Sequence, residues 1–320
     1  MTIQELSPPA ARPSPMTRRR LIFLGLVVLA GSACVALAAL GYIQPVVLGI
    51  VQGLTEFMPI SSAAHLILMR WFFHWQSGMT DSLNFDLALH LGTLIALLCY
   101  FWRDWAEILG SAPGTVRWGL RRVRGDRFYK PSLGEHVLMS MILATIPGMI
   151  LGVLLEPYVQ HGLLRSPRLL AFTLTLGGLL LYMADTRRPE RLPLERISFR
   201  QSLLIGLAQS CALVPGLSRM ATTITMGRLL TLDRSAATRY SFLLSAPITL
   251  AAIVFNLDAL VNIPSNEIIF FAAGVLVSAI IGLLTIHVLL DFVGRFGFGA
   301  FAVYRALLAI AIVIVYFMRT

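Results

Sequence analysis

Runs of apolar residues, separated by short polar stretches, organise most of this chain. Six of them predict helices that cross a membrane, at residues 85–102, 137–155, 169–183, 240–256, 268–290 and 301–317. An earlier apolar run over 21–40 follows an arginine cluster at 18–20. It predicts an extra N-terminal transmembrane helix after a cytoplasmic tail over 1–20. The pattern therefore predicts an all-α polytopic membrane protein.

Two further apolar segments, 42–73 and 201–230, are too interrupted by polar residues and prolines to cross a membrane simply. Pro59 ends a helix in the first segment, because its ring clashes with the preceding turn. Ser61 or Ser62 is then placed to cap a second helix. We predict that each segment is a re-entrant helical hairpin, since non-helical backbone at membrane depth must be buried in protein or line a wet cavity.

The two hairpins belong to a repeat. Gly49-x-x-Gln52, followed by Pro59 and Ser62, recurs as Gly206-x-x-Gln209, followed by Pro215 and Ser218, and three predicted spans follow each copy. The first hairpin enters from outside and the second from inside, so we predict two inverted repeats, at 42–184 and 201–320. Broken helices of inverted repeats typically meet near the membrane midplane and form a polar site there.

Composition and charge agree with a membrane protein. Of 320 residues, 57% are hydrophobic and 13% are charged, which excludes an ordinary soluble domain. The net charge of +10 does not indicate a nucleic-acid partner, because the arginines gather in two short loops around 103–130 and 187–200. Both loops fall on one side of the predicted topology, which the positive-inside rule makes cytoplasmic. The three cysteines lie in apolar segments without metal-ligand spacing, so neither disulfides nor a zinc site is expected.

The hairpins carry the polar residues that are hardest to explain in a membrane. The first contains Gln52 and Glu56, one helical turn apart, and then Ser61, Ser62 and His65; the second contains Ser218, Arg219, Thr222 and Thr223. An ionisable residue inside a bilayer costs roughly 3 kcal/mol or more on insertion scales, so it is by default a functional hypothesis. Arginine, hydroxyls and helix N-termini together favour phosphate binding.

A carboxylate beside such a site limits the chemistry. Glu56 would repel a bare phosphate, so it indicates either a bridging metal or a general base that activates a nucleophile. His65 could act as acid, base or nucleophile, Ser62 as the attacking or the attacked hydroxyl, and water is a further candidate nucleophile. Arg219 could stabilise charge on a transferring phosphoryl group. Phosphoryl transfer at a membrane is the predicted reaction class.

Structural interpretations exist beside these functional ones. Gln52 and Glu56 could bond between helices, His65 could be a structural hydrogen-bonding residue, and Arg219 could form a resting ion pair with Glu56. For Asp86 and His90, four residues apart on one predicted helix, we prefer an interface hydrogen bond that supports the hairpin, with a role around the site as the alternative. Three further arginines are predicted interfacial anchors whose charges reach the headgroups: Arg70, Arg103 and Arg305.

Two motifs resemble those of a known family. Gln-Gly-Leu-Thr-Glu-Phe-Met-Pro-Ile-Ser-Ser-Ala-Ala-His at 52–65 resembles the (E/Q)xxxE motif, with its downstream serine and histidine, of the undecaprenyl-diphosphate phosphatase family of the bacitracin-resistance type. Pro-Gly-Leu-Ser-Arg at 215–219 resembles that family's PGxSRSxxT motif. The similarity extends through 85–92, 101–103, 176–180 and 240–247, and covers the chain from about residue 42 onward.

The resemblance implies a multi-pass hydrolase of the bacterial inner membrane that cleaves undecaprenyl diphosphate to the monophosphate. That reaction recycles the lipid carrier of peptidoglycan synthesis and protects against bacitracin, which competes for the substrate. The resemblance further implies a divalent cation, Mg²⁺ or Ca²⁺, with Glu56 in metal binding or base catalysis. Ser62 and His65 would act near the scissile phosphate and Arg219 on the diphosphate, with Gln52, Ser61, Ser218 and Thr223 as further substrate-binding residues. The site would face the periplasm. The resemblance leaves open whether the protein forms a homodimer.

The chain departs from the family pattern at two places. Gln52 stands where many members have glutamate, and Met220-Ala221 replace Ser-Gly after the arginine. We therefore expect activity with weaker or altered metal dependence. The main alternative is a transporter or flippase of polyprenyl phosphate lipids, since inverted repeats with broken helices are typical of transporters. Glu56, Ser62 and His65 favour the enzyme, because an anion clamp alone needs neither base nor nucleophile. An acid-phosphatase fold is disfavoured, because the chain has no Pro-Ser-Gly-His run.

Overall fold

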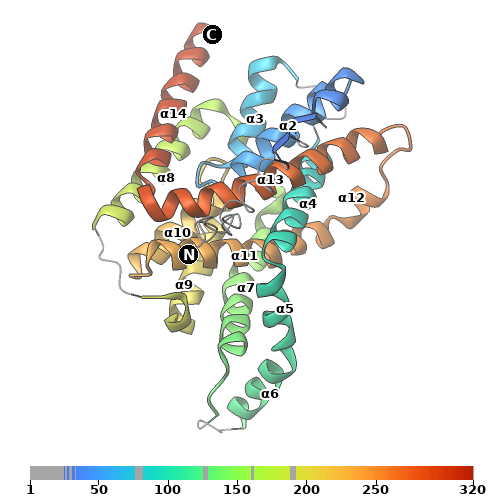
Figure 1. The fold of residues 1–320 in the computed structure, drawn as a ribbon. Helices are drawn as coiled ribbons and strands as arrows, with labels where there is room; N and C mark the ends of the chain where they lie inside the picture. Colours follow the sequence, from blue (N-terminus) through green and yellow to red (C-terminus); the bar gives the residue numbers. More distant parts are fainter. Residues whose placement is uncertain are drawn as a thin grey trace, which may run out of the picture.

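The computed structural model describes residues 25–319, apart from 26, 29–30, 33, 76–81, 125–128, 160–161 and 188–191. The predicted tail over 1–20 lies outside these residues. Of the predicted N-terminal helix over 21–40, residues 34–39 are helical, and residues 21–24 also lie outside the described part of the chain. From Ile43 onward the described residues form helices joined by turns (Figure 1).

Six helices in the described part of the chain are long and apolar enough to cross a membrane, and they confirm the six predicted spans. They are α4 (Leu83–Tyr100), α7 (Leu133–Val159), α8 (Pro167–Arg187), α11 (Arg234–Phe255), α13 (Ile268–Phe296) and α14 (Gly299–Arg319). The shorter elements between them include η1 (Gly162–Arg165), η2 (Leu194–Arg196) and α12 (Leu257–Val261). The chain is an all-α polytopic membrane protein.

Both predicted hairpins form two helices around a non-helical turn. The first comprises α2 (Ile43–Thr55) and α3 (Ser62–Phe73); the second comprises α9 (Phe199–Ser210), the 3-10 helix η3 (Cys211–Leu213) and α10 (Arg219–Leu229). A serine caps each second helix, Ser61 with φ 78° and Ser218 with φ 69°, and its hydroxyl accepts a bond from the backbone N–H three residues on. Ser218 therefore corresponds to Ser61, whereas the repeat pattern in the sequence had paired Ser218 with Ser62.

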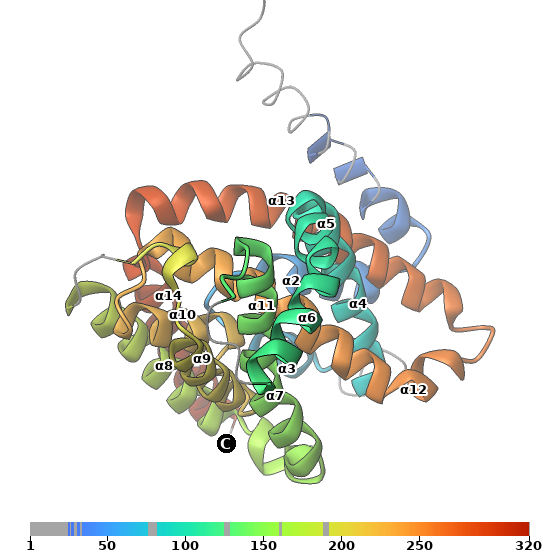
Figure 2. The ribbon, with the colours of Figure 1, turned by 90° about the horizontal axis from the view of Figure 1, so that it is seen from below.

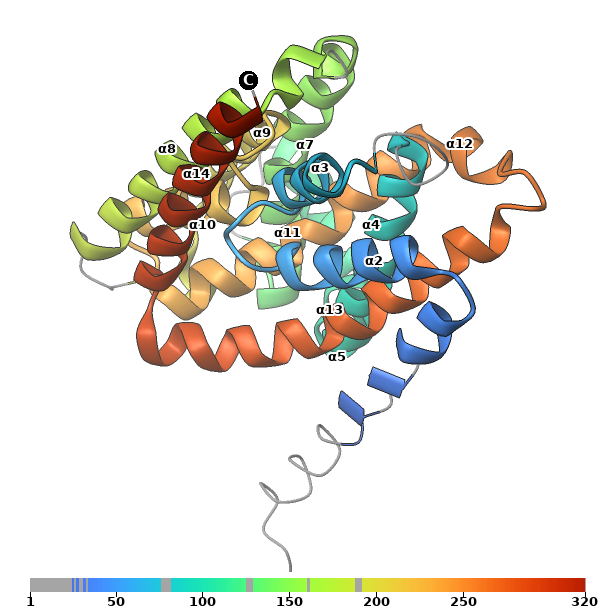
Figure 3. The ribbon, with the colours of Figure 1, turned by 90° about the horizontal axis from the view of Figure 1, so that it is seen from above.

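Each hairpin packs against a helix of the other half of the chain. α2 lies along α13 and α8 along α14 (Figure 3), while α9 packs on α7. Glycines permit these close approaches: a Cβ at Gly49 would stand 2.9 Å from the carbonyl oxygen of Gly274, and one at Gly206 would stand 2.2 Å from that of Ala144. The two glycines hold the same place in their hairpins, three residues before Gln52 and Gln209.

Buried aromatic side chains fix the first turn. Phe57, directly after Glu56, is 1% exposed and packs on Phe242 of α11, with ring centroids 5.7 Å apart. Phe242 in turn contacts Phe101 at the end of α4. This cluster belongs to the main apolar core, which lies among α4, α10, α11 and α13. The core therefore holds the backbone of the turn on which Glu56 stands.

The first predicted basic loop is mostly helical. α5 (Trp102–Gly110) and α6 (Ala112–Val123) pack against α7 and project with it from the rest of the molecule (Figure 1), so they stand in front in the view from below (Figure 2). Pro113 stands in the first turn of α6, where its missing N–H breaks no helical hydrogen bond. Arg239 of α11 pairs with Asp104 of α5 and ties this arm to the bundle. The sequence predicted a loop here because the many charged residues interrupt the amphipathic pattern of both helices.

Candidate active site

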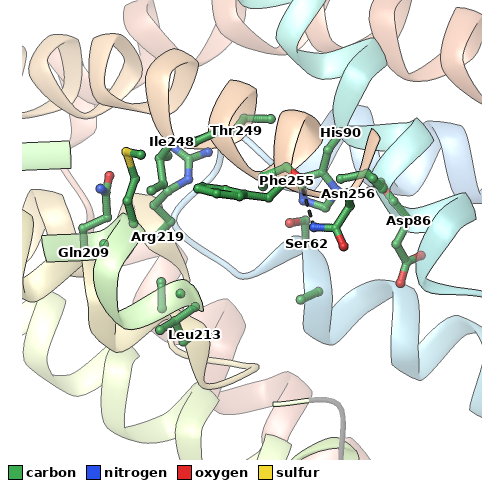
Figure 4. A pocket seen from close by; sticks show the side chains of 18 of the residues that line it. Ser62, Asp86, His90, Gln209, Leu213, Arg219, Ile248, Thr249, Phe255 and Asn256 are labelled. Atoms are coloured by element: carbon green, nitrogen blue, oxygen red, sulfur yellow. Dashed lines mark hydrogen bonds between the residues drawn. The ribbon is translucent and has the colours of Figure 1, made fainter. Parts of the chain in front are cut away.

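The turns of the two hairpins face a cavity of about 480 Å³. Its polar wall includes Glu56, Ser61 and Ser62 from the first hairpin and Ser218 and Arg219 from the second. Side chains of α7, η3 and α11 form much of the apolar wall: Met149, Val153, Leu213, Ile248 and Phe255. Figure 4 shows how side chains from α4, α11 and both hairpins converge on the cavity. A ligand with a charged head and an apolar tail matches these two walls.

Glu56 is the centre of the polar network. Its Oε1 accepts a hydrogen bond from Arg219 Nη2 at 2.5 Å, and its Oε2 accepts one from Ser62 Oγ at 2.6 Å. Gln52 Nε2 also donates to Oε2, at 3.1 Å, and His90 Nε2 lies 3.5 Å from the same oxygen. Bonds to an ionised group are roughly twice as strong as neutral ones, so these partners hold the buried carboxylate in one orientation.

Arg219 joins the second hairpin to the first. It is the first residue of α10, where the helix dipole adds positive potential. Its Nη1 bonds Ser245 of α11, and its Nη2 completes the ion pair with Glu56. This ion pair had been one interpretation of Arg219 from the sequence. It places a cation, a carboxylate and the Ser62 hydroxyl together at the cavity wall.

Arg305 of α14 binds the two turns to each other. Its side chain is fully buried, and its guanidinium donates to the carbonyl oxygens of Pro59 and Gly216 at 2.9 and 2.7 Å. It also donates to two carbonyl oxygens of α8. The Gly216 N–H donates to Ser61 Oγ at 3.2 Å, so the turns also contact directly. The prediction that Arg305 is an interfacial anchor was wrong, because the carbonyl groups of unwound turns bind its charge inside the protein.

Asp86 and His90 lie between the first hairpin and the cavity. Asp86 pairs with Arg70 of α3 at 2.5 Å, which confirms its supporting role. Arg70 is only 3% exposed, so the prediction of an interfacial anchor was wrong for this residue as well. His90 lines the cavity, with Nδ1 2.7 Å from the Asp86 carbonyl oxygen and Nε2 toward Glu56. The four-residue spacing of Asp86 and His90 predicted that they share one helix face. It did not predict which of the two side chains would face Glu56.

Three predicted site residues do not line the cavity. Gln52 is fully buried and supports Glu56. His65 Nδ1 lies 2.7 Å from the Ser61 carbonyl oxygen and its Nε2 2.7 Å from the Tyr304 hydroxyl, so both ring nitrogens are engaged elsewhere. Thr223, like Thr222, donates to the carbonyl oxygen of Arg219. The catalytic role of His65 and the substrate-binding roles of Gln52 and Thr223 stay predictions.

The donors around Glu56 fit a metal ion only in part. The described residues contain no group of three or more His, Cys, Asp or Glu side chains that could hold one. Mg²⁺, however, is commonly bound by one or two carboxylates together with substrate phosphates. Gln52 Oε1 is buried and lacks a hydrogen-bond partner in the described part of the chain, but Gln52 turns its amide nitrogen toward Glu56 and does not line the cavity. This set fits a cation shared with a diphosphate better than a cation bound by protein alone.

Comparisons with known proteins agree with this chemistry. A family model described as "Bacitracin resistance protein BacA" matches residues 45–311. The chain is similar to the undecaprenyl-diphosphatase of Moorella thermoacetica, with 42% identity over 278 residues that cover 87% of this chain and 98% of the relative. The undecaprenyl-diphosphatase of Pelotomaculum thermopropionicum is 41% identical over 85% of this chain and 95% of its own length. That of Gemmatimonas aurantiaca is 42% identical over 84% and 96%, respectively.

Proposed function

Because this chain belongs to the bacitracin-resistance family, we propose that it hydrolyses undecaprenyl diphosphate to undecaprenyl phosphate and inorganic phosphate. The Glu56–Arg219 pair carries the proposal, since it joins both hairpins at one wall of a cavity whose other wall is apolar. The diphosphate binds at the charged wall and the polyprenyl tail along the apolar one. The reaction returns the lipid carrier to cell-wall synthesis. It also removes the diphosphate for which bacitracin competes, and so confers resistance.

Ser62 and Glu56 have the geometry of a nucleophile and its base. The Ser62 hydroxyl gives its proton to Glu56 Oε2 as its oxygen attacks the terminal phosphorus. The bond from that phosphorus to the bridging oxygen breaks, the lipid phosphate departs as an anion on the side opposite Ser62, and Glu56 releases its proton to solvent. Water then attacks the phosphoserine and gives a proton to Glu56, which returns it to the Ser62 oxygen. Inorganic phosphate and undecaprenyl phosphate are the products.

Arg219 supplies the positive charge for this reaction. In the resting state Glu56 neutralises it. When a diphosphate binds, the guanidinium turns its donors toward the phosphate oxygens, which it can bind bidentately. Fixed donors of this kind stabilise the charge that develops on the transferring group. His90, beside Glu56 Oε2, holds the carboxylate in place while Arg219 changes partner.

A divalent cation, Mg²⁺ or Ca²⁺, would be held by Glu56 together with diphosphate oxygens. When bound, it adds positive charge to the phosphoryl group and makes it a better electrophile. Gln52 turns its amide nitrogen toward Glu56 and does not line the cavity, which supports weaker metal dependence than a second carboxylate at that place would give.

The two halves of the chain are inverted repeats, each with a re-entrant hairpin and three spans. Gln52 precedes Ser61 by nine residues and Gln209 precedes Ser218 by nine, and both serines cap helices at positive φ. Contacts between elements repeat in the same way: α2 packs on α13, and α9 on α7, while α8 and α14 pack on each other. The additional N-terminal transmembrane helix predicted over 21–40 lies partly outside the described residues and stays a prediction.

The protein lies in the bacterial inner membrane with its cavity open to the periplasm. The cavity is lined by the first turns of α4, through Leu83 and Asp86, and by the last turns of α11, through Phe255 and Asn256. The opposite end of α4 leads into the arginine-rich α5 and α6, and the opposite end of α11 begins at Arg234. The positive-inside rule makes those opposite ends cytoplasmic, which supports a periplasmic cavity.

Phosphate release from undecaprenyl diphosphate by the purified full-length protein in detergent tests the proposal, with and without Mg²⁺. We expect Mg²⁺-stimulated release by the parent, and a loss of about a hundredfold or more in kcat for Glu56→Gln and Arg219→Ala, since one removes the base and the other the charge stabiliser. Arg295→Ala is the matched control, because it removes an exposed arginine that only pairs with Asp291 on the surface of α13.

Two results would contradict the proposal. A folded parent that releases no phosphate under either condition would exclude the hydrolase, and assays of lipid flipping with the same variants would then test the transporter alternative. Release that is unchanged in both site variants would move the reaction away from this cavity. The thermal midpoint of each variant in detergent shows whether it is folded.

A further inference from the structure

The second hairpin contains a buried amide that the mechanism does not use. Gln209 of α9 lines the cavity and is only 3% exposed, yet neither its Nε2 nor its Oε1 has a hydrogen-bond partner among the described residues. Leaving a buried amide unpaired is costly, and native proteins seldom do so without a functional reason. Because Gln209 lines the cavity, a ligand bound in the cavity could supply the missing hydrogen-bond partner.

The repeat explains why this amide lacks a partner. Gln52 holds the corresponding place in the first hairpin and donates to Glu56, four residues later on the same face. Four residues after Gln209 stands Leu213, which has no acceptor. The second hairpin has thus kept the amide of the first but not the carboxylate that binds it.

The position of Gln209 indicates which part of a substrate it would meet. Figure 4 shows Gln209 on the side of Arg219 that faces away from Ser62 and His90. Its Nε2 stands against α7, where a Cβ at Gly148 would come within 3.1 Å of it. Gly148 and Gln209 both line the cavity. The amide therefore lies against α7, and in this view Arg219 stands between it and the nucleophile Ser62.

We propose that Gln209 Nε2 donates a hydrogen bond to the phosphate that stays on the lipid, the leaving group of the reaction. This inference rests on the proposed function. In an in-line displacement, the leaving oxygen lies opposite the nucleophile. As the bond between the terminal phosphorus and the bridging oxygen breaks, that oxygen keeps the electron pair, and negative charge grows on the lipid phosphate. An N–H donor at that place stabilises the charge and also binds the lipid product.

Two variants of Gln209 test the contact, beside the matched control Ser210→Ala. Gln209→Leu removes the donor, and Gln209→Glu keeps the shape but places a carboxylate near the phosphate. Ser210 is the next residue and also lines the cavity, but its hydroxyl already donates to the Gly206 carbonyl oxygen and not to a ligand, so its removal should have little effect. Full-length proteins are compared by kcat/KM for undecaprenyl diphosphate and by the inhibition constants of undecaprenyl phosphate and of inorganic phosphate.

The two products report on the two phosphate positions separately. For Gln209→Leu we expect kcat/KM to fall, and the inhibition constant of undecaprenyl phosphate to rise, by roughly tenfold to a hundredfold, the usual effect of a hydrogen bond to a charged group. The constant for inorganic phosphate should change by less than about threefold. Gln209→Glu should lose more than Gln209→Leu, because like charges repel.

Several outcomes would overturn the inference. Unchanged constants in a folded Gln209→Leu protein, or a loss confined to inorganic phosphate, would exclude contact with the lipid phosphate. Equal loss for both products would assign Gln209 a packing role. If the leucine variant does not fold, Gln209→Met takes its place, and the rise in thermal midpoint with undecaprenyl phosphate gives a second readout of binding. A parent protein without activity would instead refute the proposed function.

Discussion

The two oxygen atoms of Glu56 have different partners, and both matter for the reaction. Oε1 is bound by Arg219 and Oε2 by Ser62, so one side of the carboxylate is neutralised while the other is ready to accept a proton. Breaking such a buried pair from one side leaves an uncompensated charge, at a cost of about 3–5 kcal/mol. Glu56→Gln keeps the shape of the side chain and one acceptor oxygen, while its amide NH2 group replaces the second acceptor by a donor. It therefore separates loss of the base from loss of the fold better than an alanine would.

The nucleophile can be identified by a quench experiment. With substrate labelled with ³²P in the terminal phosphate, acid quenching during a single turnover should trap labelled phosphoserine on the parent and none on Ser62→Ala. We expect this because Ser62 Oγ is 2.6 Å from its base. Ser62→Ala should also lose about a hundredfold or more in rate. Absence of label at every time point, together with turnover by Ser62→Ala, would assign the attack to water.

Sequence predicted the centre of this site but not its surroundings. Glu56, Ser62 and Arg219 could be found because charge and hydroxyls next to a helix break are unusual in an apolar segment. The sequence favoured His65 over His90 for catalysis, because His65 follows Ser62 in the hairpin and His90 stands on the next predicted helix. Their difference arises from packing: Tyr304 of α14 engages one ring, and Glu56 faces the other. Arg305 was misread because its carbonyl partners exist only once both turns have formed.

At the scale of elements, glycines set how closely the hairpins pack. Gly49 and Gly206 bring α2 against α13 and α9 against α7. The first helix of each hairpin is thereby fixed along its length, and its polar end is held beside the cavity. The turn that follows can then adopt positive φ at its capping serine without loss of position. The location of Glu56 and Gln209 depends on these contacts as much as on the turns themselves.

Gly206→Ala tests this packing directly. Its Cβ would lie 2.2 Å from the carbonyl oxygen and 2.7 Å from the Cα of Ala144, both backbone atoms that cannot rotate away. We expect a loss of about 1–3 kcal/mol, typical of overpacking, seen as a lower thermal midpoint in detergent. Gly294→Ala in α13 is the control, since its Cβ would meet nothing within 4 Å; there we expect no loss. Equal midpoints for the two variants would refute a packing role of Gly206.

The helices and the hairpin turns were the features of this protein that the sequence predicted best. Long apolar runs locate the six spans, because a helix must cover the membrane with apolar side chains, and Pro59 and Pro215 locate both turns. α5 and α6 were not predicted from the sequence, because arginines interrupt their apolar positions. Trp102, Leu109 and Val116 are nevertheless exposed beside them, a pattern of helices at a membrane surface.

At the scale of the whole molecule, the cavity and the arginine-rich arm lie at opposite ends of α4 and α11. This separation makes the orientation of the protein measurable. After Cys34, Cys99 and Cys211 are replaced by alanine, single cysteines are introduced at Asn84, in the cavity, and at Val123, which is 88% exposed on α6. Each variant must keep its activity for the comparison to hold.

A membrane-impermeant maleimide applied to cells with a permeabilised outer envelope and an intact inner membrane should label Asn84→Cys. It should label Val123→Cys only after the inner membrane is disrupted. This follows from the positive-inside rule, which places the arm in the cytoplasm. The reverse pattern would turn the cavity toward the cytoplasm and contradict the proposed orientation.

Arg305 also has a consequence for how the protein is made. It belongs to α14, which follows both hairpins in chain order, yet it supplies the donors for the carbonyl groups of Pro59 and Gly216. During synthesis the helices emerge one after another, so both turns leave the ribosome before the residue that joins them. A growing chain can therefore insert its hairpins without having a functioning centre. We therefore expect hydrolysis of the lipid to begin only when α14 has docked, and a chain that ends before Arg305 to lack activity.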